Sequence, residues 1–306
     1  MMMIRHGVAE PVRPSRVVVL GGSGFVGRAI MEELSRLSVP AVSVSSREAD
    51  LCHPEAVEVL RGLVRREDAV VFVSALTPDK GKDAGTLMRN LAMGRTVSAL
   101  VEQPTCSHVV YLSSDAVYSD AVSLIRESSP CDPATFHGLM HLVRERMLRQ
   151  AVQRSRLPLF IIRPCAVYGP GDSHNSYGPN RFVRTALAER TITLFGQGEE
   201  RRDHVFIRDV ARLAGLGLQH RSDGIANAAT GAAVSFAHLA RMIAELSGES
   251  VRIESTPRQA PVTHRHVDPA AVLRAFPTFR PTLLRVGLAE TITHAAERFQ
   301  QPVLAP

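Results

Sequence analysis

Apolar and polar positions along the chain change period in a regular way. Short β-branched runs, of which Val17 to Leu20 is the first, are typical of buried strands, and longer stretches with apolar residues every three or four positions are typical of helices. The predicted strands are 16–20, 41–45, 69–74, 108–113 and 159–163, and the predicted helices between them are 25–37, 54–65, 84–102 and 136–154. Because such alternating elements are joined by right-handed crossovers, the pattern predicts an α/β fold with a doubly wound parallel sheet.

A glycine-rich loop follows the first predicted strand and opens the first predicted helix. Gly21, Gly24 and Gly27 let the backbone turn tightly and approach a pyrophosphate, whose charge the N–H groups at the helix start can bind. Phe25 and Val26, the first residues of the helix, are assigned to the same site. The alternative is an ordinary strand-to-helix turn, but the further alternations favour a Rossmann domain that binds a dinucleotide cofactor.

The end of the second predicted strand bears on which dinucleotide is bound. Sites for NAD usually place an Asp or Glu there, on the ribose 2′-hydroxyl, whereas this strand ends in Ser45, Ser46 and Arg47. Hydroxyls and a guanidinium bind a 2′-phosphate that an acid would repel, so the sequence favours NADP(H) over NAD(H). The alternative is that Arg47 is a solvated loop arginine.

The regular alternation of predicted strands and helices ends after Arg163. Glycines and prolines cluster in 169–171 and 178–179, and helical periodicity returns near Phe182 and over 236–246. We therefore expect a smaller C-terminal substrate-binding lobe. The predicted division is a flexible tail over 1–14, a Rossmann domain over 15–165 completed by 205–230, and a substrate-binding lobe from 166–204 and 231–306.

Composition excludes several classes of function. The formal charge of +6 suits small anionic substrates, but no basic run with interleaved aromatic residues indicates nucleic acid binding. The four cysteines are far apart in the sequence, which predicts neither disulfides nor a metal cage and favours the reducing cytoplasm. No stretch approaches the roughly 20 apolar residues of a membrane span.

The motifs together resemble the extended short-chain dehydrogenase/reductases, and within them the NAD-dependent epimerase/dehydratase family that acts on nucleotide sugars. The resemblance covers residues 16 to about 300 and rests on Gly21 to Gly27, Asp50-Leu51, Ser74 to Leu76, Asn90, Val110 to Tyr118, Arg163 to Gly171 and Arg202 to Asp209.

The resemblance implies a role for each matching position. Asp50 and Leu51 would lie along the adenine of the cofactor. The positions implied for the cofactor ribose and diphosphate are Ser74, Ala75 and Leu76, and those near the nicotinamide include Pro164 and Val167. The helices 84–102 and 136–154 are the pair through which relatives form a homodimer.

Substrate contacts are implied as well. Asn180 and Arg202 match positions that contact the nucleotide sugar in relatives, and a guanidinium is a natural partner of a diphosphate. The alternative for Arg202, which lies in a charged run, is a solvated hairpin tip. Tyr177 lies in the Gly/Pro-rich loop and is a further candidate for binding the sugar.

The chain departs from the family at its catalytic residues. Relatives combine a Ser or Thr with a Tyr-x-x-x-Lys on a helix, and here Ser114 stands in place while His137 replaces the Tyr and His141 replaces the Lys. On a helix both histidines project on one side with Glu145, apart from an apolar arc that includes Leu139, so they are not expected to face the core. The alternatives are histidines satisfied in the packing and, through the i, i+4 spacing, a metal site that lacks an evident third ligand.

Two functions follow from this departure. Histidine titrates near neutral pH, so the first is an NAD(P)-dependent nucleotide-sugar epimerase, dehydratase or reductase in which Ser114 orients the reacting oxygen, His137 transfers the proton and His141 touches the ribose. The second is a cofactor-binding protein, a sensor or partner subunit, that has lost redox turnover.

Overall fold

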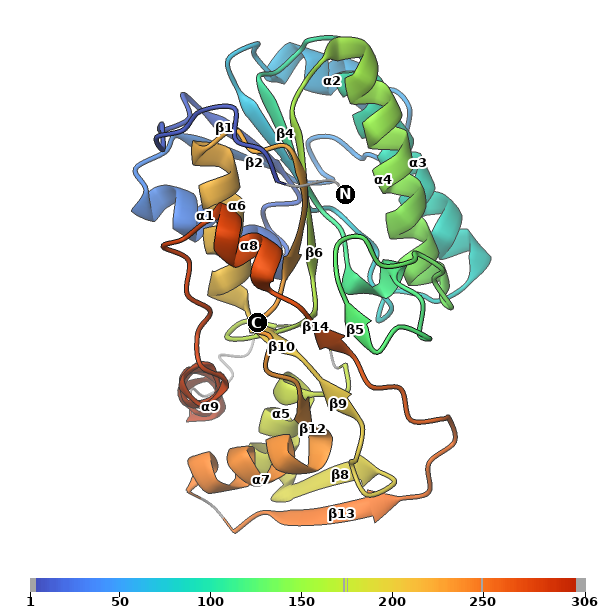
Figure 1. Cartoon of the computed structure of the whole chain (residues 1–306), viewed down its shortest axis with the longest axis vertical. Coiled ribbons are helices and arrows are strands. Elements are labelled where there is room, and N and C mark those ends of the chain that lie inside the picture. The colour runs from blue at the N-terminus through green and yellow to red at the C-terminus, as the bar shows by residue number, and fades with distance from the viewer. Residues whose placement is uncertain (1–3, 173, 175, 249, 301–306) are drawn as a thin grey trace.

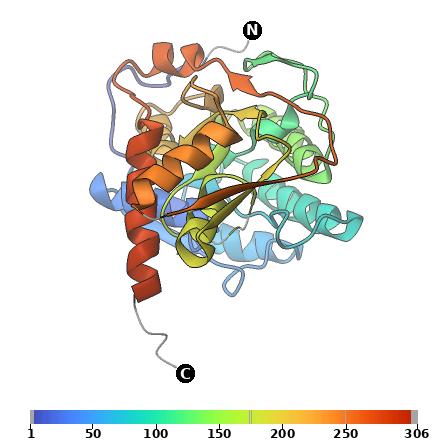
Figure 2. The ribbon, with the colours of Figure 1, turned by 90° about the horizontal axis from the view of Figure 1, so that it is seen from below.

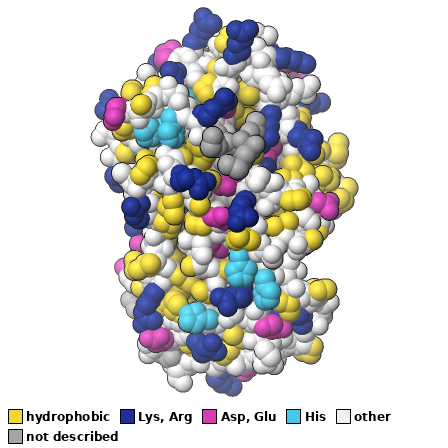
Figure 3. Space-filling model, in the orientation of Figure 1, with side chains coloured by type: hydrophobic (Ala, Val, Ile, Leu, Met, Phe, Trp, Pro, Cys, Tyr) yellow, Lys and Arg dark blue, Asp and Glu magenta, His cyan; other side chains and the backbone are white. Residues whose placement is uncertain are grey.

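A computed structural model describes residues 4–172, 174, 176–248 and 250–300. Figure 1 shows two lobes stacked along the long axis, with the central sheet in the larger upper lobe. In the space-filling view of Figure 3 the outline is indented between the two lobes on the right-hand side. Among the described residues, no helix is long and apolar enough to cross a membrane.

The upper lobe contains a parallel sheet with the strand order β11-β6-β4-β3-β1-β2. The strands are β1 (Val17–Leu20), β2 (Ala41–Val44), β3 (Ala69–Phe72), β4 (His108–Leu112), β6 (Leu159–Pro164) and β11 (Gly224–Ala228). Every residue of β1 and β3 is buried, because helices cover both faces of a doubly wound sheet. The predicted fold class is confirmed.

Helices cover the two faces of this sheet (Figure 1). One face carries α2 (Ala56–Leu63), α3 (Ala84–Val101) and α4 (Phe136–Ser155), and the other carries α1 (Phe25–Arg36) and α6 (Ile207–Gln219). The helix α6 and the strand β11 return to this lobe from late in the chain, so the sheet is completed by residues on the far side of the substrate-binding segment.

The lower lobe is built from short elements. Its helices are α5 (Pro179–Glu189), α7 (Phe236–Ser247) and α9 (Leu284–Gln300), and its strand pairs are β8 (Thr191–Phe195) with β13 (Arg252–Thr256) and β9 (Arg201–Arg202) with β12 (Val234–Ser235). Figure 2, seen from below, shows α7 and β13 in front of the upper lobe, with α9 along one side.

Two small strand pairs and one short helix lie where the lobes meet. The pairs are β7 (Ala166–Tyr168) with β10 (His204–Phe206) and β5 (Leu124–Ile125) with β14 (His266–Val267), and the helix is η1 (Asp115–Val117). The chain crosses between the lobes through these segments (Figure 1). The short helix α8 (Ala270–Ala275) lies beside α6 in the upper lobe (Figure 1).

Part of the predicted tail contacts the upper lobe. Val8 and Val12 donate backbone hydrogen bonds to the end of α6, and the ring of His6 lies 2.9 Å from the Ser222 hydroxyl and 2.8 Å from the Ala275 carbonyl. The turns after α6 and α8 offer these backbone and hydroxyl partners. The flexibility of the segment stays a prediction. Residues 1–3 of the predicted tail lie outside the described residues.

Candidate functional site

The glycine loop has the shape that a dinucleotide phosphate requires. Gly21 has φ +93°, and a Cβ at Gly27 would lie 2.1 Å from the Gly21 carbonyl oxygen, so neither position tolerates a side chain. Gly24 caps α1 without any side-chain hydrogen bond, which leaves the first N–H groups of the helix available to an anion. Phe25 is buried and Val26 half-buried at the same helix start. The backbone here fits a pyrophosphate.

A small cavity of about 60 Å³ gathers residues that the sequence assigned to the adenosine half of the cofactor. Ser46, Asp50, Leu51 and Ser74 all line it, at the carboxyl ends of β1, β2 and β3. Leu51 is buried and offers an apolar wall, whereas Asp50 is exposed and accepts a hydrogen bond from the backbone N–H of Cys52. Residues from the loops after β2 and β3 therefore meet where a parallel sheet binds nucleotides.

The end of β2 carries an acid that the sequence analysis passed over. Glu48 Oε2 accepts hydrogen bonds from the backbone N–H and the hydroxyl of Ser45, at 2.7 and 2.9 Å, and these bonds lower the pKa of Glu48. Arg47 is exposed beside it. A cation and an anion thus both stand near the expected ribose position.

Side chains of α3 and α4 bond the backbone of the loop from Ser74 to Leu76. Asn90 of α3 accepts from the Leu76 N–H and donates to the Leu76 carbonyl, both at 2.9 Å. The fully buried guanidinium of Arg144 donates to the Ser74 carbonyl at 2.9 Å and to the side-chain oxygen of Asn90 at 3.0 Å. Ala75 lies between these anchored residues, so the loop predicted to follow the cofactor ribose is rigid.

The start of α4, which carries His137, lies close to η1, the short helix that Ser114 caps. Ser114 caps η1, with its hydroxyl accepting from the Ala116 N–H at 3.1 Å. Gly138 permits the approach, because a Cβ there would lie 2.1 Å from the Ala116 carbonyl oxygen. His137 borders a cavity of about 430 Å³ between α4 and the segment 76–87, and its Nδ1 is buried without a hydrogen-bond partner among the described residues.

The side chain of His141 faces the core, whereas the helical pattern predicted that it would not. Its side chain is 5% exposed and its Nδ1 lies 2.8 Å from the hydroxyl of Tyr111 on β4, so the expectation that it does not face the core is wrong. Arg144 and Glu145 share this buried face, whereas Leu139 of the apolar arc is 36% exposed. The polar face turns inward because strands β4 and β6 offer it partners. The contact of His141 with the ribose stays a prediction.

Both histidines of α4 are neutral at physiological pH. Burial, together with the positive charges of Arg144 and His174, lowers the pKa of His137 to about 4. Burial also lowers the pKa of His141 well below its usual value, with His137 and Arg144 adding to the shift. The rings of His137 and His141 meet edge to face at 4.8 Å between centroids. A neutral imidazole can still accept a proton from a substrate hydroxyl.

Glu145 does not bind a metal in this arrangement. Its carboxylate accepts two hydrogen bonds from the guanidinium of Arg163, at 2.8 and 2.5 Å, and one from the Ser113 hydroxyl at 2.6 Å. Within residues 4–172, 174, 176–248 and 250–300, no group of three or more His, Cys, Asp or Glu side chains could hold a metal ion. The acid joins α4 to β4 and β6.

The candidate substrate cavity, of about 310 Å³, opens where the two lobes meet. Ala116 and Thr135 line it from the upper lobe, and Tyr177 and Arg202 line it from the lower lobe. Arg202 is half-buried in β9, not at a hairpin tip, and donates to Glu200 through Nε and Nη2 at 2.9 and 2.5 Å. The cavity therefore joins the Ser114 region to a guanidinium, as a nucleotide diphosphate-sugar site requires.

Four other predicted residues have definite places. Tyr177 lines the cavity, and its hydroxyl accepts a hydrogen bond from the Phe195 N–H at 3.0 Å. Asn180 does not line this cavity and bonds the N–H and carbonyl of Gly169 at 3.1 and 2.8 Å. Pro164 ends β6, and Val167 of β7 pairs with Val205 of β10 next to the cavity.

Two further cavity residues were missed by sequence reasoning. Arg265 is 8% exposed and donates to the Asp115 carbonyl at 2.8 Å, yet nothing in the sequence links these distant positions. His204 lines the cavity with an exposure of 3% and belongs to the motif Arg202 to Asp209. The only feature of the sequence that could have indicated His204 is its position two residues after Arg202, the predicted diphosphate contact.

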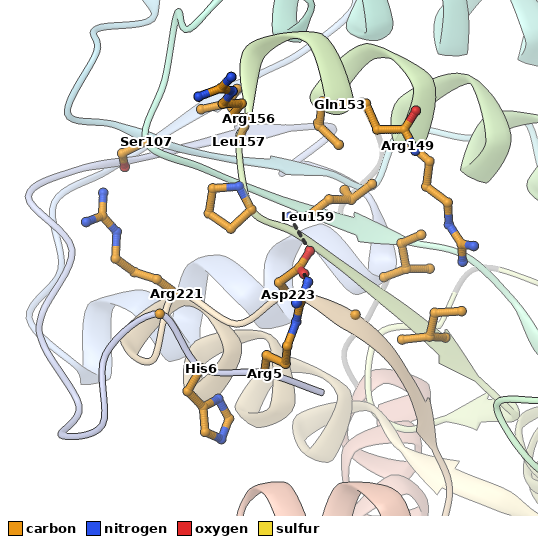
Figure 4. Close-up of a pocket in the computed structure, with 16 residues that line it drawn as sticks. Arg5, His6, Ser107, Arg149, Gln153, Arg156, Leu157, Leu159, Arg221 and Asp223 are labelled. Carbon is orange, nitrogen blue, oxygen red and sulfur yellow. Dashed lines mark hydrogen bonds and ion pairs between the residues drawn. The ribbon is translucent and has the colours of Figure 1, made fainter. Parts of the chain in front are cut away.

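A cavity of about 800 Å³ lies at the opposite end of the sheet (Figure 4). It is bordered by the first residues of β6 and β11, Leu159 and Gly224, whereas dinucleotides bind at the carboxyl ends of parallel strands. Figure 4 shows Arg156 and Arg221 at its edge, which follow the last turns of α4 and α6. Helix C-termini favour such cations, so the arginines need no ligand to explain them.

Comparison with known proteins agrees with this geometry. Residues 17–229 match the NAD dependent epimerase/dehydratase family. The UDP-glucose 4-epimerase of Azospirillum brasilense is 27% identical in an alignment 274 positions long, which covers 77% of this chain and 78% of the relative. The dTDP-4-dehydro-6-deoxy-D-allose reductase of Streptomyces bikiniensis is 25% identical in an alignment 315 positions long, which covers 90% and 94% of the two chains.

Solved structures share the fold. The UDP-glucose 4-epimerase of Thermus thermophilus in complex with NAD superposes with a TM-score of 0.81 at 22% identity, over 92% of this chain and 99% of that one. The GDP-L-fucose synthetase of Naegleria fowleri bound to NADP gives 0.84 at 16% identity, over 97% and 98%. The chain belongs to the NAD dependent epimerase/dehydratase family of extended short-chain dehydrogenase/reductases.

Proposed function

We propose that the protein is a nicotinamide-dependent enzyme that acts on a nucleotide sugar, with histidine in place of the usual acid/base tyrosine. One observation carries the proposal: Gly138 packs against Ala116, which holds the start of α4, with His137, against the segment that Ser114 begins. The glycine loop lies on the same edge of the sheet, and the substrate cavity begins at Ala116. In this proposal the cofactor, the proton-transfer group and the substrate diphosphate all lie near the carboxyl ends of the parallel strands.

Each residue has a distinct role in this proposal. When bound, the nicotinamide supplies hydride transfer. Ser114 orients the reacting hydroxyl or carbonyl oxygen, and the neutral ring of His137 takes or returns its proton. His141 touches the ribose. Arg144 keeps a positive charge under Ser74, which offsets part of what the chain loses with histidine rather than lysine at position 141.

The test is turnover of a nucleotide sugar. Purified protein with NAD(H) or NADP(H) is mixed in turn with UDP-glucose, GDP-mannose, dTDP-glucose and CDP-glucose. The expected result is a change in the nicotinamide absorbance near 340 nm or in the anomeric NMR signals with at least one of them. Tight cofactor binding without turnover of any sugar would overturn the enzymatic proposal.

A second function is favoured by the position of His141. Its ring is buried and hydrogen-bonded to Tyr111, which is what a histidine satisfied in the packing would show. On this reading the protein binds its dinucleotide as a sensor or partner subunit without redox turnover. Cofactor binding is common to both functions, so turnover alone separates them.

We propose NADP(H) as the preferred cofactor, on the basis of Ser46 and the exposed Arg47. Arg47→Ser should weaken NADPH binding about 10-fold and leave NADH binding nearly unchanged, because a charge-assisted bond to the 2′-phosphate is lost. Glu48→Gln is the matched test of the neighbouring acid and should strengthen NADPH binding. Fluorescence titration measures both, and tighter binding of NADH by the unaltered protein would reverse the preference.

We also propose a homodimer through α3 and α4. Met88, Phe136 and Leu139 on these helices are 63%, 46% and 36% exposed, and Figure 3 shows hydrophobic side chains over the lower ends of both helices. Leu139→Asp should shift the protein to monomers in analytical ultracentrifugation. The control is Val286→Asp on α9, where the side chain is 56% exposed and the dimer should persist. A monomeric unaltered protein would contradict the proposal.

The cytoplasm is the proposed location. Cys52, Cys106, Cys131 and Cys165 are all free thiols, as a reducing compartment permits. Cell fractionation of the native host tests this directly, and recovery in an extracytoplasmic fraction would contradict it.

A further inference from the structure

His204 occupies an unusual position in the wall of the substrate cavity. It is 3% exposed, and neither ring nitrogen has a hydrogen-bond partner among the residues that the structure describes. The ring meets Phe236 edge to face at 5.9 Å between centroids, and the nearest charge that influences it is Arg202. A buried polar group without a partner is costly, so this one calls for an explanation.

The strand pairing directs this ring toward the cavity. His204 of β10 pairs in parallel register with Ala166 of β7, and directly paired residues project to the same face of a sheet. Ala166 is exposed and lines the cavity, whereas the next residue, Val205, is 1% exposed and projects to the opposite face, into the core. The small side chain of Ala166 leaves space in front of the imidazole.

The imidazole can offer nitrogen to that space without disturbing its surroundings. A half-turn about the Cβ–Cγ bond exchanges Nδ1 with Cδ2 and Nε2 with Cε1 while the ring keeps its volume. The edge of His204 that borders the cavity can therefore present a hydrogen-bonding atom to a bound molecule.

We propose that His204 binds a hydroxyl group of a sugar ring in the nucleotide-sugar substrate and so contributes to substrate specificity. This inference rests on the proposed function and names a contact that the sequence analysis did not assign. One ring nitrogen donates to a sugar oxygen and the other accepts from a sugar hydroxyl.

The chemistry favours a hydroxyl over a phosphate. A neutral imidazole has one donor and one acceptor nitrogen, and a hydroxyl is both donor and acceptor, whereas a phosphate oxygen only accepts. Burial and the charge of Arg202 lower the pKa of His204 to about 3, so the ring stays neutral. The cationic groups for a diphosphate are already present in Arg202 and Arg265.

The test compares three variants by calorimetry. His204→Leu removes both nitrogens at similar volume, His204→Gln keeps one donor and one acceptor, and His238→Leu changes an exposed histidine on α7 as the control. Each protein, with cofactor added, is titrated with UDP-glucose, GDP-mannose, dTDP-glucose and CDP-glucose and with the corresponding nucleoside diphosphates. Thermal unfolding verifies that every variant is folded.

The expected result is that His204→Leu binds the preferred nucleotide sugar about 10- to 100-fold more weakly, while His204→Gln recovers most of the loss. A loss confined to the nucleotide sugar assigns the contact to the hexose, and an equal loss for the nucleoside diphosphate assigns it to the ribose.

Two outcomes would overturn the inference. Unchanged affinity of the folded His204→Leu variant would remove the contact while leaving the proposed function standing. If the unaltered protein binds none of the four nucleotide sugars, the proposed function falls and the inference falls with it. A purely structural role would make Leu and Gln alike, so recovery by Gln separates binding from packing.

Discussion

The inner face of α4 and the wall of the substrate cavity each bury a histidine, with opposite consequences. His141 is 5% exposed and His204 is 3% exposed, so burial does not distinguish them. His141 has a hydrogen bond to Tyr111, whereas both nitrogens of His204 lack partners among the described residues. The hydrogen-bond partner, rather than the depth of burial, distinguishes the two histidines: His141 has one within the protein, and His204 is the histidine for which we propose a ligand.

The difference arises from what surrounds each ring. The face of α4 lies on strands that carry polar side chains, and Tyr111, Ser113 and Arg163 bond the residues that the helix turns inward. His204 meets Phe236, whose ring offers no comparable partner. On our proposal, a hydroxyl of the bound substrate supplies the partner that His204 lacks in this cavity.

The largest expected effect is on the turnover of a variant at His137, a third histidine, whose Nδ1 lacks a hydrogen-bond partner among the described residues. His137→Ala should lower kcat by about 10²- to 10⁴-fold, because the group that exchanges the proton is removed, while cofactor affinity stays nearly intact. Steady-state kinetics with the preferred nucleotide sugar and cofactor titration measure the two quantities. His141→Ala should weaken cofactor binding as well, and unchanged turnover in His137→Ala would remove that residue from the mechanism.

Acid should destabilise the protein through its buried neutral histidines. Burial lowers the pKa of His204 to about 3 and that of His108 to about 4, whereas the unfolded chain binds these protons near pH 6.5. As the pH falls through 6.5 the unfolded state binds protons first, so the free energy of unfolding should drop by about 2 kcal/mol for each histidine between pH 7 and 5.

Urea unfolding at pH 7, 6 and 5 measures this slope. The loss should stop growing below the folded-state pKa values, and His204→Leu should remove its own share of the pH dependence. An equal slope in the variant and the unaltered protein would show that the folded-state pKa of His204 is not depressed.

His141→Leu should destabilise the fold by about 1–3 kcal/mol, because it leaves the buried hydroxyl of Tyr111 without its partner. The double variant His141→Leu with Tyr111→Phe should recover most of this loss, since both polar groups are then gone. Urea unfolding at pH 7 gives the two values. Additive losses in the double variant would argue against the hydrogen bond.

His204→Leu should have the smallest effect on stability and the opposite sign. Removing the nitrogens of His204 breaks no hydrogen bond to any described residue. The free energy of unfolding should therefore stay equal or rise by about 1 kcal/mol at pH 7. The same measurement without ligand tests it. A loss as large as that of His141→Leu would show that His204 has a structural partner and would end the contrast between the two regions.

Several features could be predicted from the sequence because they depend on residues close together in the chain. The strand 17–20, the turn through Gly21 and the helix from Phe25 follow from local periodicity and from the space that glycine leaves. Ser114 likewise caps a helix two residues away through its own hydroxyl. The adenosine cavity was predictable in composition because parallel strands end at one edge.

The surroundings of α4 were not predictable in this way. Helical geometry groups His141, Arg144 and Glu145 on one side, but whether that side faces solvent or the sheet depends on residues 18 to 70 positions away, such as Arg163 and Ser74. A charged helix face is buried only where other residues supply hydrogen-bond or ion-pair partners. The periodicity of the sequence shows which positions are hydrophobic but not where such partners lie.

The sequence by itself determined the Rossmann architecture and its glycine loop, since each depends on residues close together in the chain. The replacement of the family's catalytic Tyr and Lys by His137 and His141 stays a prediction. The tertiary structure alone decided which histidines are partnered. It placed Tyr111 against His141, Ala166 beside His204, and Arg265 next to Asp115, 150 positions earlier in the chain. Hydrogen bonds join atoms that are close in space, and residues far apart in the sequence come within that distance only when the chain is folded.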